Sequence, residues 1–73
     1  MNMQKVESSQ IHAVGYDAEK KTLRVSFKSG GVYDYADVPE QVHKDMLAAE
    51  SVGSFFHKNV RGIYQHKKLE SAS

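Results

Sequence analysis

Apolar residues occupy every second position in the middle of the chain, which is the period of a half-buried β-strand. Leu23, Val25 and Phe27 alternate there with polar and charged residues. Two further strands are predicted at residues 11–16 and 32–36, and the turns between the three strands at 17–21 and 29–31. Three strands joined by two short connections indicate an antiparallel meander.

The length of the second hairpin loop decides which side chains face the core, because opposed residues of a ladder share a face. A two-residue loop turns Asp34 toward the apolar face and buries its carboxylate at a high cost. A three-residue loop at 29–31 instead sets Tyr33 beside Phe27 and brings Tyr35 to the same face. The sequence therefore predicts the three-residue loop, with both tyrosine rings toward the core and their hydroxyls at its edge.

The buried face of the first strand stays open at this point. Two sets of alternate residues compete for it: Ile11, Ala13 and Gly15, or His12, Val14 and Tyr16. Both sets have the period of a strand, so the pattern alone does not choose between them.

Two helices are predicted in the second half of the chain. Asp37 is the expected N-cap of the first helix, with Glu40 completing a capping box and Pro39 in the first turn. Ser51 is the expected cap of the second helix, whose apolar stripe runs over residues 52–64. Helices this short need a surface to pack on. The predicted fold is therefore α+β, a three-stranded antiparallel meander covered on one face by two helices (β-β-β-α-α).

Composition limits the classes of protein to which the chain can belong. Its 73 residues, 40 % hydrophobic and 26 % charged, predict one folded domain over residues 6–66, with flexible ends at 1–5 and 67–73. The absence of cysteine excludes a disulfide framework and a thiolate zinc site. Apolar runs are far shorter than the ~20 residues that span a bilayer, and the start lacks a secretory signal. We therefore expect a cytoplasmic protein without a membrane segment.

Catalytic and metal-binding constellations are not recognisable in this sequence. The four histidines, His12, His43, His57 and His66, do not have the spacing of a known metal motif, and exposed, solvated histidines are the expectation. The serines lie outside any nucleophile elbow. We therefore expect no enzyme, no cofactor and no metal.

Charge is distributed unevenly, although the net charge is only +1. Residues 57–68 contain four lysines and arginines and no acidic residue, whereas residues 40–50 contain three acidic residues. A continuous second helix is expected to present Lys58, Arg61 and Lys68 on one side. The outer face of the sheet is expected to present Arg24 and Lys28. We interpret these cations together as a phosphate-binding surface; a solvated surface without a ligand is the alternative.

A set of residues in a fixed order carries a resemblance: Ser8-Ser9, Ile11, Gly15-Tyr16, Leu23-x-Val25-x-Phe27, Gly30, Tyr33-x-Tyr35, Val38-Pro39, Ala49-x-Ser51-x-Gly53, Phe56, Val60-Arg61 and Tyr64. The set resembles the KTSC domain, a family named for the C-terminus of some lysyl-tRNA synthetases and also found as small bacterial and phage proteins. Its hallmark is the central Tyr-x-Tyr. The family's function is not established. The synthetase fusion suggests RNA binding, and the resemblance implies a part in it for Tyr33, Tyr35 and Arg61.

We therefore expect a non-enzymatic module that binds nucleic acid, RNA rather than DNA, through its basic face. Stacking of bases on Tyr33 and Tyr35 competes with the register argument, which turns both rings toward the core. The alternative function is protein interaction or self-association through the open sheet face or a strand edge. Val14, Tyr16 and Val32 are the residues expected to form an apolar patch there.

Overall fold

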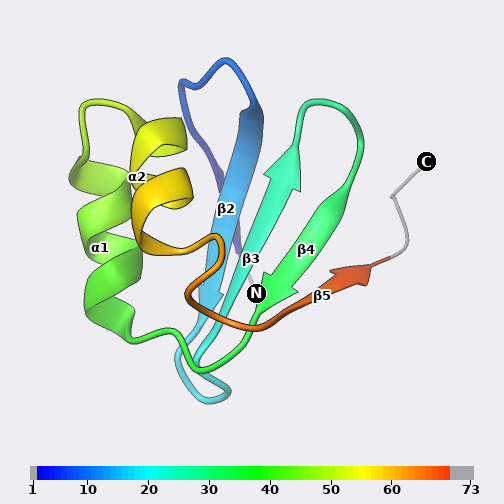
Figure 1. Cartoon of the computed structure of the whole chain (residues 1–73), viewed down its shortest axis with the longest axis vertical. Coiled ribbons are helices and arrows are strands. Elements are labelled where there is room, and N and C mark those ends of the chain that lie inside the picture. Colours follow the sequence, from blue (N-terminus) through cyan, green and yellow to red (C-terminus); the bar gives the residue numbers. More distant parts are fainter. Residues whose placement is uncertain (1, 70–73) are drawn as a thin grey trace.

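The computed structural model of the chain describes residues 2–69 and has an α+β fold. Five antiparallel strands form one sheet in the order β1-β2-β3-β4-β5, and both helices pack on the same face of it (Figure 1). The elements are β1 (Met3–Lys5), β2 (Ile11–Asp17), β3 (Thr22–Phe27), β4 (Val32–Tyr35), α1 (Glu40–Ala48), α2 (Val52–Asn59) and β5 (His66–Leu69).

The sheet has two more strands than the sequence predicts. The expected meander forms its centre, and β1 and β5 extend it at the two edges where flexible ends were expected. Strand β1 pairs with β2, with Gln4 opposite Val14, and β5 pairs with β4, with Lys67 opposite Asp34. Both added strands are short, polar and exposed, as edge strands commonly are. They therefore lack the apolar alternation that marks a half-buried strand.

Strand β5 exists because the second helix is shorter than predicted. Helix α2 ends at Asn59, and the backbone N–H groups of Val60 and Arg61 both donate to the carbonyl of Phe56. Gly62 follows beyond the C-cap in the left-handed region with φ +81°, which a glycine adopts without strain and from which a helix does not continue. The predicted alignment of Lys68 with the other cations on one continuous helix is therefore wrong.

The second hairpin has the predicted loop length but a different register. Its three-residue loop is 28–30 rather than 29–31, because the backbone N–H of Phe27 donates to the carbonyl of Gly31 at 2.8 Å. Tyr33 consequently lies opposite Val25, two residues from the expected partner. A shift of two residues preserves the face to which each side chain points. Both tyrosine rings therefore face the helices, as predicted.

A bulge in β2 resolves the open question of its buried face. The register changes at His12, so that Ile11 and Val14 both face the helices and His12 is exposed. Tyr16 faces the same way, and its hydroxyl donates to the carbonyl of Val38. Neither regular alternation is therefore correct. The expected apolar patch on the open face is also wrong, because Val14 and Tyr16 belong to the core side.

The start of α1 differs from the predicted capping box. Pro39 occupies the N-cap position without a side-chain hydrogen bond, and the helix begins at Glu40. Asp37 instead has φ +56°, and it precedes the fully buried Val38. The backbone N–H of Val38 donates to the carbonyl of Lys21 at 2.9 Å. Burial of Val38 thus determines the path of the chain into the helix.

The core lies between the helix pair and the sheet. Phe56 of α2 is 1 % exposed and makes edge-to-face contacts with Phe27 and Tyr35, at centroid distances of 5.5 and 5.3 Å. The predicted cap of α2 is confirmed, since the Ser51 hydroxyl accepts from the Ser54 backbone N–H. The buried apolar residues of the core are Ile11, Val14, Leu23, Val25, Tyr35, Val38, Met46, Val52, Phe56 and Val60.

We expect Phe56→Ala to lower the free energy of unfolding by about 3–5 kcal/mol, because it leaves a large cavity at the centre of the core. Urea denaturation measures the loss. The matched control is Ile63→Ala, a truncation of a side chain that is 61 % exposed and that should cost less than about 0.5 kcal/mol. Equal losses for the two variants would contradict this packing.

His43 gives the fold a dependence on pH. Its ring stacks on Tyr16, with centroids 5.3 Å apart and planes at 14°. Burial lowers the pKa of His43 below its ordinary value of 6.5, and nearby Glu40 opposes this in part. The unfolded chain therefore takes up a proton at higher pH than the folded chain does. The neutral His43 ring therefore contributes fully to stability when the pH is above the pKa of this histidine in the unfolded chain. The contribution is lost as the pH falls below that pKa toward the lower pKa of the folded protein.

We expect His43→Gln to weaken this dependence, because glutamine does not titrate. Unfolding free energies of both proteins, measured between about pH 5 and about pH 7.5, provide the comparison. The wild-type protein should lose more stability on acidification than the variant. An identical loss in both would show that His43 is not the group responsible.

Candidate nucleic-acid interface

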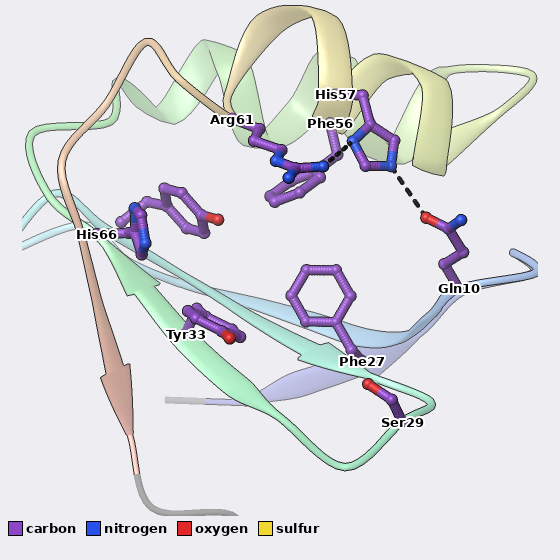
Figure 2. Close-up of a pocket in the computed structure, with 9 residues that line it drawn as sticks. Gln10, Phe27, Ser29, Tyr33, Phe56, His57, Arg61 and His66 are labelled. Carbon is purple, nitrogen blue, oxygen red and sulfur yellow. Dashed lines mark hydrogen bonds between the residues drawn. The ribbon is translucent and has the colours of Figure 1, made fainter.

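A pocket of about 360 Å³ opens between α2 and the helix-facing side of the β3–β4 hairpin. Figure 2 shows Phe27 and Tyr33 reaching into it from the sheet, His57 and Arg61 from the side of α2, and His66 at one end. The residues that line it are Gln10, Phe27, Ser29, Tyr33, Tyr35, Phe56, His57, Arg61 and His66.

The inner wall of the pocket is aromatic. Phe56 and Tyr35 are almost fully buried and close its floor, while Phe27 and Tyr33 are half-buried and contribute the more accessible ring edges. Phe27 and Tyr33 meet edge to face at 5.5 Å and 84°. Because each ring is held by another ring, the wall has little freedom to collapse. Both tyrosines of the Tyr-x-Tyr motif thus belong to the core and to this pocket at once.

The outer rim of the pocket is polar and is held together by hydrogen bonds. The Nε2 of His57 lies 2.9 Å from the Oε1 of Gln10, and a guanidinium nitrogen of Arg61 lies 3.4 Å from the Nδ1 of His57. These contacts join the end of α2 to the loop before β2 (Figure 2). His66 comes from β5, with its ring 5.3 Å from the ring of Tyr35.

The charged groups at the rim are cationic or able to become cationic. One guanidinium and two imidazoles line the pocket, and none of the described lining residues has a carboxylate. Within residues 2–69 the salt bridges are Arg24–Asp34 and Lys44–Glu40, so the Arg61 guanidinium is not neutralised by an acidic side chain. The pocket therefore suits an anionic ligand that also has an apolar or aromatic part.

The surroundings of Tyr35 shift the pKa of its hydroxyl. Its burial raises the pKa of the Tyr35 hydroxyl, the neighbouring Tyr33 adds to the rise, and the Arg61 charge opposes it. The hydroxyl therefore stays protonated at neutral pH. It is available to the pocket as a neutral hydrogen-bonding group.

Three of the predicted site residues come together in this pocket: Tyr33, Tyr35 and Arg61. Arg24 is elsewhere, on the opposite face of the sheet, where its guanidinium makes two hydrogen bonds to Asp34 at 2.7 and 3.0 Å. The hydrogen bonds to Asp34 raise the pKa of Arg24, and the guanidinium is engaged by this ion pair rather than free for a ligand.

The remaining predicted cations do not line the pocket. Lys28 is exposed in the hairpin loop beside the lining residue Ser29, and Lys58 is exposed on α2. Lys68 is exposed on β5, opposite Tyr33. These predicted cations are therefore spread over three separate elements rather than aligned along one helix.

Sequence reasoning missed the histidines of this site. His57 and His66 were expected to be solvated surface residues, yet both line the pocket. The signal for His57 was its position four residues before Arg61, which predicts contact on a helix. No comparable signal was available for His66, because its position depends on the unpredicted strand β5. Gln10 and Ser29 are loop residues whose place in the pocket depends on the tertiary fold.

Metal binding and membrane insertion receive no support from the described part of the chain. Residues 2–69 contain no group of three histidine or acidic side chains placed to hold a metal ion. Neither helix within this range has the length and apolar character needed to cross a bilayer.

Comparison with known proteins gives matches over nearly the whole domain. The KTSC domain profile matches residues 7–64. A crystal structure of a KTSC domain protein from Yersinia pestis has a TM-score of 0.91 and 35 % sequence identity, and the match covers 93 % of this chain and 96 % of that one. A protein of Tsukamurella paurometabola is 48 % identical over 59 residues, which are 81 % of this chain and 88 % of that protein.

A longer protein also contains this sequence pattern. The lysine–tRNA ligase of Nostoc sp. is 37 % identical over 65 residues, which are 89 % of this chain. The chain spans only 12 % of the length of that ligase. The similarity is therefore to one segment of the ligase.

Proposed function

The chain belongs to the KTSC domain family, and we propose that it is a non-enzymatic module that binds single-stranded RNA. The observation that carries the proposal is a single pocket in which aromatic rings, a guanidinium and two imidazoles converge without a carboxylate among the described lining residues. An unpaired nucleotide has the complementary chemistry, since it combines a flat base with an anionic phosphate.

The aromatic wall favours a single strand over a duplex. Bases that are unpaired can leave the stack and lie against aromatic or guanidinium planes, whereas bases inside a helix cannot. The more accessible rings at the pocket are those of Phe27, Tyr33, His57 and His66. Tyr35 and Phe56 are too deeply buried for face-on stacking, so in this proposal they shape the floor.

The exposed lysines around the pocket extend the proposed contact to neighbouring phosphates. Lys28, Lys58 and Lys68 lie in the hairpin loop, on α2 and on β5, respectively. Each of these elements contributes a residue to the pocket. A strand that enters the pocket with one nucleotide would thus pass cations on several sides. Arg24 has no part in this surface, because it is paired on the other face.

The relatives favour RNA over DNA as the ligand. A lysine–tRNA ligase is named for a reaction on transfer RNA, and a segment of one such protein is 37 % identical to this chain. A second binding module linked to an enzyme strengthens the hold on a shared ligand, because its binding becomes intramolecular, and RNA is the ligand that such a module would share with this ligase. The ligase reaction itself is not transferred to this chain, which spans a minor part of the ligase.

We expect Arg61→Glu to weaken binding of a fluorescently labelled single-stranded RNA by about tenfold or more, since it removes one phosphate contact and adds repulsion. Fluorescence anisotropy at low salt measures the Kd, and the wild-type affinity should fall steeply as salt is raised. The matched control is Lys20→Glu, which makes the same change in charge at an exposed turn outside the pocket lining.

Two results would contradict the proposal. One is that neither single-stranded RNA nor DNA binds to the wild-type protein at low salt. The other is that Lys20→Glu weakens binding as much as Arg61→Glu, which would assign the affinity to net charge rather than to the pocket. If DNA binds more tightly than RNA, the pocket remains the proposed binding site, but the preference for RNA is wrong.

A protein-interaction module is the second candidate. Ile63 is 61 % exposed, three residues before the edge strand β5. An exposed apolar side chain beside an unpaired strand edge favours pairing with another chain. Light scattering at several concentrations distinguishes this candidate, because self-association through the edge should increase the mass with concentration and Ile63→Lys should reduce it.

A further inference from the structure

The hydrogen bonds of His57 determine which of its nitrogens carries the proton. A guanidinium can only donate, so the contact of 3.4 Å requires the Nδ1 of His57 to accept from Arg61. The other nitrogen then carries the hydrogen and donates to the Oε1 of Gln10 at 2.9 Å. In this arrangement the acceptor nitrogen of His57 is occupied by the group that a phosphate would attract.

A phosphate at the rim would reverse this arrangement. Once Arg61 donates to a phosphate oxygen, the Nδ1 of His57 has lost its donor and faces an anion. Protonation of Nδ1 then supplies a second charge-assisted hydrogen bond to the same phosphate. We infer that the pocket binds one unstacked nucleotide of an RNA strand through its phosphodiester, held between Arg61 and a His57 that takes up a proton as the ligand binds. This inference rests on the proposed RNA-binding function and names the part of the RNA that enters the pocket.

The size of the pocket supports a single nucleotide. A volume of about 360 Å³ is at the lower end for small-molecule sites, and the inner end is closed by buried Phe56 and Tyr35. The cations lie at the rim and the rings lie deeper, so the base enters first and the phosphate remains outside. A longer stretch of strand therefore continues over the surface rather than into the pocket.

Charged and titratable groups face His57 from several elements. Arg61 contacts the Nδ1 of His57 at 3.4 Å in the free protein, and binding of a phosphate by the guanidinium would free that nitrogen. His66, from β5, and the hydroxyls of Tyr33 and Tyr35, from β4, are the other titratable groups lining the pocket. On the opposite side, His57 borders a neighbouring hollow.

Two carboxylates line that neighbouring hollow: Glu7, before β2, and Glu50, before α2. They lie outside the pocket that receives the phosphate. Lys58, next along α2, is exposed to solvent and its charge is therefore well screened. In this proposal the charge that His57 gains is compensated by the anion at the rim.

The dinucleoside monophosphate UpU tests this inference, because its single phosphodiester does not titrate near neutral pH. The Kd is measured by NMR titration at about pH 7 and about pH 8, where uptake of one proton predicts binding up to about tenfold weaker at the higher pH. Uridine, which lacks the phosphate, should show no such dependence. His57→Gln should abolish the dependence for UpU, whereas His12→Gln, an exposed histidine outside the pocket lining, should preserve it.

The outcomes separate this inference from the proposed function. If decauridine binds but UpU affinity does not change with pH, or changes equally in His57→Gln, the inference is wrong and RNA binding stands. Loss of the dependence in His66→Gln with its retention in His57→Gln also overturns the inference. If UpU binds with the predicted dependence and decauridine does not bind, the nucleotide site stands and the strand-binding function is wrong. Binding of neither ligand overturns both.

Discussion

The contacts of Phe56 with Phe27 and Tyr35 are the interaction on which the rest of the structure depends. They join α2 to two adjacent central strands and fix the distance between helix and sheet. The same three rings, together with Tyr33, form the inner wall of the pocket. A domain of this size has one small core, and here the edge of that core is also the candidate binding surface. Stability and recognition therefore involve the same side chains.

The central strands and both helices were predictable because each carries a regular apolar period. The alternation around Val25 and the helical stripe containing Phe56 both express burial on one side, which the structure confirms. Edge strands β1 and β5 were not predictable in this way, since polar residues exposed on both faces have no period to detect. The predicted end of α2 was wrong for a related reason. The apolar stripe continues past Gly62 in the sequence, whereas the backbone leaves the helix before that residue.

The candidate site was predictable only in part. The tyrosine motif and Arg61 were found through the family resemblance, and the pocket unites them. The charge pattern alone grouped Arg24 with the other cations, because the sequence does not show that Asp34 lies directly across the ladder and neutralises it. His66 depends on the pairing of β5 with β4, a long-range contact that periodicity does not encode. Local patterns thus identified residue types, and tertiary pairing decided which of them meet.

The bulge at His12 has a consequence for how this domain can vary. Because one extra residue in β2 lets Ile11 and Val14 both reach the core, removal of that residue would reverse the side on which Ile11 lies relative to the rest of the strand. The side chain at the bulge is exposed and packs on nothing in the core. The burial of Ile11 therefore depends on the number of residues at this position rather than on which residue occupies it.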